Sequence, residues 1–153
     1  MKRCSAQWSH RRSRYLPLVV SEPVSTTVSV VIADDQADLR KVLRLALRLD
    51  GRFEVVGEAA SAAEAEHLAR TLRPTVVILD LGMPDKSGLD AIPEIRRTSP
   101  ETRILVYSAW AAARVAEQAV SLGADRYLEK EAGLHEVIAV LAEICCLGQP
   151  GAG

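Results

Sequence analysis

Residues 75–80 read Thr-Val-Val-Ile-Leu-Asp, an apolar run of mostly β-branched side chains that ends in a carboxylate. A strand that is apolar at every position has to be covered on both faces, as in the centre of a parallel sheet. The run therefore predicts a central strand over residues 75–79 and places Asp80 at its carboxyl end.

Similar runs flank this stretch in both directions along the chain. They predict strands over residues 28–33, 53–58, 103–107 and 126–128. Between them apolar residues recur at helical spacing, as in Leu39, Val42, Leu43 and Ala46 before a stop at Asp50-Gly51. Five such strand and helix units predict an α/β fold with a parallel sheet.

The helices carry their own start and stop signals. Ser61 and Glu64 have the spacing of a capping box, and Gly123 ends a helix over residues 111–122. A last helix is predicted over residues 134–147. Leu89, Ile92 and Ile95 mark another helix, in which Pro93 is tolerated only if it lies in the first turn.

Length and composition fit one globular domain. The chain has 153 residues, of which 48% are hydrophobic and 25% charged, so a disordered or coiled-coil protein is excluded. The net charge of -1 gives no electrostatic footprint for nucleic acid. We expect a poorly ordered extension over residues 1–27, a folded domain over residues 28–147, and a frayed tail over residues 148–153. The extension contains five basic residues and one acidic residue.

The three cysteines, Cys4, Cys145 and Cys146, have no zinc-site spacing and indicate no disulfide framework. Cys145 lies on the apolar stripe of the last helix, which predicts a small core residue. No apolar run approaches the ~20 residues of a membrane span. We therefore expect a cytoplasmic protein.

Polar residues gather at the predicted strand ends. Asp34 and Asp35 follow the first strand, Asp80 the third, Ser108 the fourth and Lys130 the fifth. Ligands of open parallel sheets bind at this edge. Three carboxylates and one ammonium group leave two net negative charges, which one Mg²⁺ with its oxygen ligands would cancel. Asp80 is the best placed nucleophile towards a phosphoryl group, and the Ser108 hydroxyl could donate to the new phosphoryl oxygens.

From Val28 to about Leu147 the chain resembles the receiver domains of two-component response regulators. The likeness rests on ordered motifs: Asp34-Asp35, Leu79-Asp80-Leu81-Gly82-Met83-Pro84 with Gly88, Ser108-Ala109, Gly123-Ala124-Asp125, and Tyr127-Leu128-Glu129-Lys130. The sequence around Asp80 is most similar to that of receivers that precede a LuxR-type helix-turn-helix domain. The resemblance implies a flavodoxin-like sheet with strand order 2-1-3-4-5.

The resemblance also implies a role for each site residue. Asp80 would be the phosphoacceptor, Lys130 would bind the phosphoryl group, and Ser108 and Tyr127 would be paired switch residues. Mg²⁺ would be held by Asp35, Asp80 and the backbone carbonyl of Gly82, with Asp34 acting through water. Trp110 and Gly82 would flank the phosphoryl group.

The implied partners are a histidine kinase or histidine phosphotransfer protein upstream and a protein downstream, with a phosphorylation-dependent homodimer as a further option. The sequence ends without a helix-turn-helix, so we expect no direct DNA binding by this chain. Many receivers have a cis proline after the lysine, whereas this chain has Glu131, so we expect a trans peptide there.

Two other functions compete with the phosphorylatable switch. A receiver that binds a partner without phosphorylation would not need the acidic and hydroxyl residues that this chain retains. An aspartate-nucleophile phosphatase of the haloacid-dehalogenase type would carry a second acid two residues after the nucleophile, where Gly82 stands.

Overall fold

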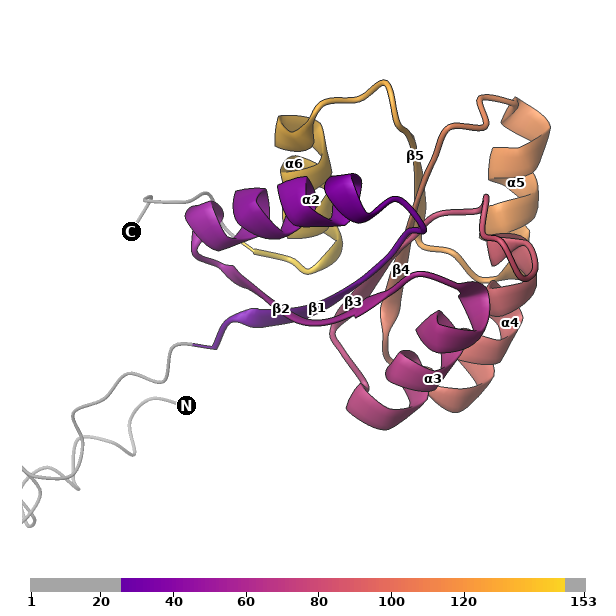
Figure 1. Cartoon of the computed structure of the whole chain (residues 1–153), viewed down its shortest axis with the longest axis horizontal. Coiled ribbons are helices and arrows are strands. Elements are labelled where there is room, and N and C mark those ends of the chain that lie inside the picture. The colour runs from indigo at the N-terminus through magenta and orange to yellow at the C-terminus, as the bar shows by residue number, and fades with distance from the viewer. Residues whose placement is uncertain (1–25, 148–153) are drawn as a thin grey trace, which may run out of the picture.

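The computed structural model describes residues 26–147, in which five strands alternate with five helices (Figure 1). The strands are β1 (Val28–Ala33), β2 (Phe53–Ala59), β3 (Val76–Leu79), β4 (Arg103–Ser108) and β5 (Arg126–Glu129). The helices are α2 (Ala37–Asp50), α3 (Ala62–Leu72), α4 (Gly88–Thr98), α5 (Ala113–Leu122) and α6 (Leu134–Ile144). Nearly all of the predicted extension and the whole predicted tail lie outside the described residues.

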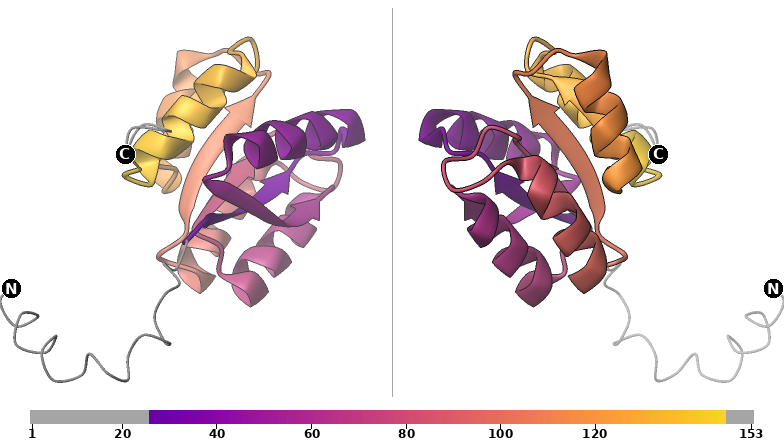
Figure 2. Two further views of the ribbon diagram at one scale, coloured as in Figure 1. Left: turned by 90° about the vertical axis from the view of Figure 1, so that its left-hand side faces the viewer. Right: turned by 90° about the vertical axis from the view of Figure 1, so that its right-hand side faces the viewer.

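The five strands form one parallel sheet in the order β2-β1-β3-β4-β5. Helices α2 and α6 cover one face, and α3, α4 and α5 cover the other (Figure 1). Figure 2 shows α3 and α4 side by side beneath the sheet. This is the flavodoxin-like fold, and the predicted strand order is confirmed.

Alternating side chains of the strands fill two cores. Val30 and Ile32 of β1 pack towards α2 and α6, whereas Val31 and Ala33 pack towards α3, α4 and α5. Every residue of β3 is buried, as expected for the central strand with helices on both faces. Because β3 is central, the residue that follows it lies in the middle of the sheet edge.

Two of the predicted helix ends are confirmed. The Ser61 hydroxyl accepts a hydrogen bond from the Glu64 N–H, which caps α3. The Glu64 carboxylate reaches back to the Ala60 N–H, one residue earlier than in a standard capping box. Gly123 follows α5 with a φ of 125°, a conformation that favours glycine.

Three local predictions were wrong. Pro93 is the sixth residue of α4 rather than part of its first turn, because Ser87 caps the helix and makes it begin at Gly88. In α2, Leu43 is buried as predicted, but Val42 is exposed and Leu47, which the prediction omits, is buried. Helix α6 ends at Ile144 rather than at residue 147; its capping residue Cys145 is half-buried and still packs against the core, as predicted for that side chain.

The chain between residues 26 and 147 contains no helix that is long and apolar enough to cross a membrane. All peptide bonds in this part of the chain are trans, including the one after Lys130, as predicted.

Candidate functional site

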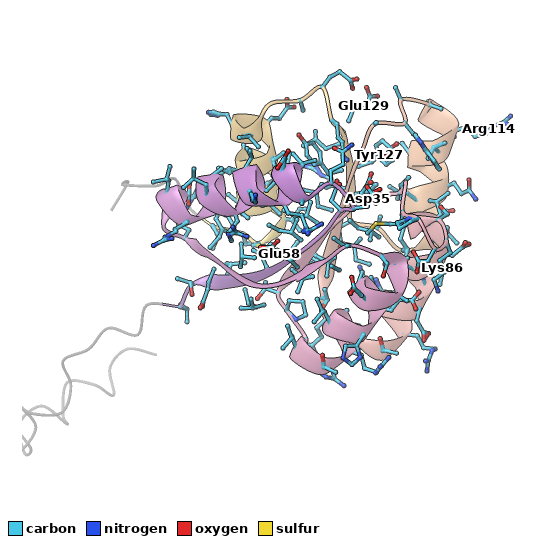
Figure 3. The ribbon with its side chains drawn as sticks, in the orientation of Figure 1. Asp35, Glu58, Lys86, Arg114, Tyr127 and Glu129 are labelled. Carbon is cyan, nitrogen blue, oxygen red and sulfur yellow. The ribbon has the colours of Figure 1, made fainter. Side chains whose placement is uncertain are left out.

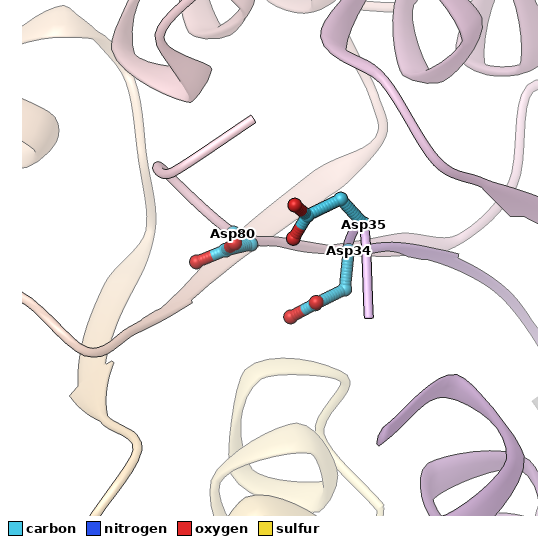
Figure 4. Close-up of side chains that lie close together, drawn as sticks. All are labelled: Asp34, Asp35 and Asp80. Atoms are coloured by element: carbon cyan, nitrogen blue, oxygen red, sulfur yellow. The ribbon is translucent and has the colours of Figure 1, made fainter. Parts of the chain in front are cut away.

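The carboxyl ends of β1 and β3 bring the three predicted aspartates together. Ala33 and Leu79 are paired in the sheet, and the Asp80 N–H extends this pairing by donating to the Ala33 carbonyl at 2.9 Å. Carboxylate oxygens of Asp34, Asp35 and Asp80 all lie within 4.8 Å of one another (Figure 4). Asp34 and Asp80 are buried, whereas Asp35 is exposed. The site therefore has a dry inner part and an open side.

Lys130 reaches this cluster from the end of β5. Its backbone N–H donates to the Ser108 carbonyl at 2.9 Å, which continues the pairing of β4 with β5 by one residue. Its Nζ lies 2.6 Å from Asp34 Oδ2 and 3.4 Å from Asp80 Oδ1. One ammonium group thus bridges the two buried carboxylates, with its shorter contact to Asp34.

Burial and charge act in opposite directions at these groups. Burial raises the pKa of Asp80, and the Asp34 carboxylate raises it further, while Lys130 and the Gly82 N–H oppose both effects. For Lys130, burial by itself would lower the pKa, but the hydrogen bond to Asp34 and the charge of Asp80 raise it overall. A single lysine therefore does not fully compensate the buried negative charge.

The donor set suits a small hard cation. All three side chains offer carboxylate oxygens, the ligand type that Mg²⁺ prefers, and the exposed side at Asp35 leaves room for the waters that this ion keeps. Both oxygens of Asp34 are already engaged: Oδ1 accepts from the Gln36 N–H at 2.8 Å and Oδ2 contacts Lys130. The acidic triad is thus consistent with a Mg²⁺ site.

Ser108 and Tyr127 both hold the backbone of Trp110. The buried Ser108 Oγ accepts from the Trp110 N–H at 3.1 Å, and the Tyr127 hydroxyl donates to the Trp110 carbonyl. Burial raises the pKa of Tyr127, so its hydroxyl keeps its proton. Figure 3 labels Tyr127, from β5, and Asp35, which follows β1; β3 and β4 lie between these two strands in the sheet. Trp110 is 44% exposed.

Two glycines shape the loop that follows Asp80. A Cβ at Gly88 would lie 2.2 Å from the Asp80 carbonyl oxygen and 2.9 Å from Leu81 Cα, so only glycine fits there without a shift of the backbone. The Gly88 N–H donates to the Leu81 carbonyl at 2.9 Å and closes the loop at its base. Gly82 is open by comparison, since its Cβ would meet only Asp80 Oδ2 at 3.7 Å.

The structure also shows supporting residues that the sequence did not reveal. Arg40 donates to the Asp34 carbonyl at 2.6 Å and is itself held by Glu58 at 3.1 Å. Asp85 accepts hydrogen bonds from the N–H groups of Ala62 and Ala63 at the start of α3. Arg40 and Asp34 are six residues apart, and the other pairs are 18 to 23 residues apart, and no local pattern marks them. Only the turn from Asp34 to Gln36 has a recognisable sequence signal, an aspartate that bonds two residues ahead.

Comparison with known proteins agrees with this geometry. Residues 30–142 match the family described as response regulator receiver domain. The chain is 33% identical over 115 residues to the chemotaxis protein CheY of Thermotoga maritima, covering 75% of this chain and 95% of that protein. It is 37% identical over 109 residues to the nitrate/nitrite response regulator protein NarP of Escherichia coli, covering 71% of this chain and 51% of NarP.

Solved structures show the same relationship. The signal receiver domain of the putative response regulator NarL from Mycobacterium tuberculosis superposes with a TM-score of 0.75 at 32% identity, covering 78% of this chain and 97% of that domain. A LuxR-family response regulator from Aurantimonas sp. gives a TM-score of 0.75 at 29% identity, covering 79% of this chain and 86% of that structure.

The acidic pocket of Asp34, Asp35 and Asp80 with its Lys130 contact is typical of a phosphoacceptor receiver. The chain belongs to the response regulator receiver family of two-component systems, and it is a signalling phosphoacceptor rather than an enzyme.

Proposed function

We propose that Asp80 accepts the phosphoryl group, and that the resulting change in charge controls a downstream protein. The main support is the position of Asp80: it is the buried carboxylate at the central strand, 3.4 Å from the Lys130 ammonium. A carboxylate oxygen would attack phosphorus while the bond from phosphorus to the donor breaks, which leaves an acyl phosphate and the free donor.

Mg²⁺ would be held by Asp35, Asp80 and the backbone carbonyl of Gly82, and Asp34 would act through water. The engagement of both Asp34 oxygens, by Gln36 and Lys130, supports this indirect role. When bound, the cation would neutralise the negative charge of the carboxylates and of the incoming phosphoryl oxygens.

Lys130 would hold the phosphoryl group, because its ammonium already points at Asp80 and can offer further N–H donors. The Ser108 hydroxyl would donate a hydrogen bond to a phosphoryl oxygen. The hydroxyl proton is not needed for the contact with Trp110, in which Ser108 Oγ is the acceptor. Ser108 can therefore bond the phosphoryl group and the Trp110 N–H together, with Tyr127 following as its switch partner through the Trp110 carbonyl.

A receiver implies a kinase partner. We propose that the phosphoryl donor is a histidine kinase or a histidine phosphotransfer protein in the cytoplasm, and that phosphorylation favours a complex with a downstream protein or a second copy of the chain. The chain spans about half the length of NarP and of several other curated relatives. The output of those longer proteins is therefore not assigned to it.

Acetyl phosphate with Mg²⁺ tests the assignment without a known kinase. Intact-mass spectrometry should show one added phosphoryl group in the wild type and in the control Asp38→Asn, which removes a carboxylate exposed on α2. Asp80→Asn should abolish the added mass, and so should a chelator. Unchanged labelling of Asp80→Asn would refute the assignment. A partner that binds equally well to the unphosphorylated protein and to Asp80→Asn would favour a receiver that works without phosphorylation.

A further inference from the structure

The loop after the phosphoacceptor is fixed at two places. At its base, Gly88 packs against the backbone of Asp80 and Leu81. At its tip, the Asp85 carboxylate straddles the start of α3: Oδ1 accepts from the Ala62 N–H and Oδ2 from the Ala63 N–H, each at 2.9 Å. The loop of residues 81–87 is thus held between α3 and α4, with Gly82 between the two attachments.

The contact at the tip is suited to hold the loop firmly. The first N–H groups of a helix have no partner within the helix, and the positive end of the helix dipole favours a carboxylate there. The hydrogen bonds from Ala62 and Ala63 lower the pKa of Asp85, so the group is a full carboxylate at neutral pH. Hydrogen bonds to a charged acceptor are about twice as strong as neutral ones.

A second contact joins the same loop to α3. Lys86 Nζ lies 2.6 Å from Glu66 Oε2, and the Lys86 side chain is 40% exposed (Figure 3). The Glu66 side chain is only 14% exposed, so this ion pair is partly shielded from water and also holds the loop to α3. The buried Met83 side chain adds apolar contact between the loop and the core. Asp85 is therefore the residue of the loop tip that bonds the backbone of α3, and Lys86 adds a side-chain contact beside it.

The start of α3 does not need Asp85 for all of its capping. The Ser61 hydroxyl already accepts from the Glu64 N–H, and the Glu64 carboxylate accepts from the Ala60 N–H. Asp85 reaches the same turn across 22 to 23 residues of sequence. Its contact therefore has a second consequence that local capping residues cannot have, because it fixes the position of the loop that carries Gly82.

We propose that Asp85 is a positioning residue for the metal and phosphoryl site, acting through the loop and not by contact with the reacting atoms. The inference rests on the proposed function, in which the Gly82 carbonyl is a metal ligand. With the tip tethered, Gly82 is held beside Asp80 before any cation binds. Without the tether, part of the cation's binding free energy has to order the loop.

Two variants separate positioning from helix capping. Asp85→Ala removes the tether together with one cap of α3, whereas Ser61→Ala removes a cap of the same helix and leaves the tether intact. Asp85→Asn keeps the shape of the side chain and one acceptor oxygen. Asp90→Asn removes a nearby exposed carboxylate of α4 that takes no part in the tether, and so controls for the loss of charge alone.

The direct readout is cation affinity, measured as free Mn²⁺ by electron paramagnetic resonance, since Mn²⁺ takes the same carboxylate and carbonyl ligands as Mg²⁺. Asp85→Ala should weaken Mn²⁺ binding by about tenfold, in the range seen when a partner that orients a metal ligand is removed. Asp85→Asn should lie between it and the wild type. Ser61→Ala and Asp90→Asn should change the affinity less than about twofold.

Labelling with acetyl phosphate gives a second readout. In Asp85→Ala the rate should fall at limiting Mg²⁺ and recover at saturating Mg²⁺, because the nucleophile itself is unchanged. Equal losses of affinity in Asp85→Ala and Ser61→Ala would overturn the inference and leave Asp85 as a helix cap. A wild type that binds no Mn²⁺ and is not labelled would instead overturn the proposed function. Should Asp85→Ala fail to fold, Asp85→Asn decides, since an affinity equal to that of the wild type refutes positioning.

Discussion

The contrast between Gly88 and Gly82 gives a direct test of how tightly the phosphoacceptor loop is packed. Replacing Gly88 with Ala puts a methyl group 2.2 Å from the Asp80 carbonyl oxygen and 2.9 Å from Leu81 Cα, both of them backbone atoms. Real Cβ atoms essentially never approach so closely. The loop must open at its base, which also strains the hydrogen bond from the Gly88 N–H to Leu81.

The expected cost follows from these contacts. Overpacking costs about 1–3 kcal/mol, and loss of the hydrogen bond adds roughly 0.5–1.5 kcal/mol. The higher helix propensity of alanine than of glycine offsets up to about 1 kcal/mol of this loss. Gly88→Ala should therefore lower the free energy of unfolding by about 0.5–4.5 kcal/mol, with a midpoint of about 2.5 kcal/mol. For a domain of this size the midpoint corresponds to a fall in Tm of roughly 8–15 °C. Gly82→Ala meets only Asp80 Oδ2, at 3.7 Å, an ordinary contact, and should stay within about 0.5 kcal/mol of the wild type.

Calorimetry and urea unfolding of the wild type and both variants, in buffer without divalent cations, measure these differences. The reasoning fails if Gly88→Ala has the same Tm as the wild type, or if Gly82→Ala loses as much stability as Gly88→Ala. Either result would mean that the loop base is free to move and that glycine at position 88 is not required by the approach to Asp80.

Two further predictions concern the switch and the tether. In a Trp8→Phe background, beryllofluoride with Mg²⁺ should change the fluorescence of Trp110, because both backbone groups of that residue are held by Ser108 and Tyr127. The Ser108→Ala variant should show a smaller change. Unchanged Trp110 emission while an independent assay shows beryllofluoride bound would disprove the coupling. The second prediction is a pH dependence. The pKa of Asp85 is lowered from its ordinary value of 3.8, so the folded protein binds this proton less readily than the unfolded chain. The stability advantage of the wild type over Asp85→Ala should therefore be constant well above pH 3.8 and shrink as the pH falls below it, as measured by urea unfolding; an advantage that grows on acidification would contradict the contact.

Most of the fold could be predicted from the sequence because its signals are local or periodic. The apolar run that ends at Asp80 requires cover on both faces, and β3 is buried at every position. The same logic placed Asp34 at the end of β1 and Ser108 at the end of β4. In a parallel sheet all strand ends meet at one edge, so the strand pattern was enough to bring these residues and Lys130 to one place.

Helix faces and boundaries were less predictable. The predicted stripe of α2 includes Leu43, which is buried, but also Val42, which is exposed, and it omits Leu47, which is buried. Five leucines and one valine share that helix, and which of them face inward depends on how the helix lies against the sheet. The start of α4 depends on the cap at Ser87 and on the close packing of Gly88, a contact with backbone that periodicity cannot reveal.

The sequence by itself determined which chemical groups the site contains, because the identity of a strand-end residue is a local fact. Only the tertiary structure decided how these groups are shared and supported. Lys130 makes its shorter contact with Asp34 rather than with Asp80, Arg40 holds the Asp34 carbonyl, and Asp85 ties the phosphoacceptor loop to α3. The contacts of Lys130 and Asp85 join segments that are distant along the chain, and Arg40 is held in place by Glu58, 18 residues further on. Their geometry is set by the packing of helices on the sheet, and packing depends on the whole set of side chains in contact rather than on any short stretch of sequence.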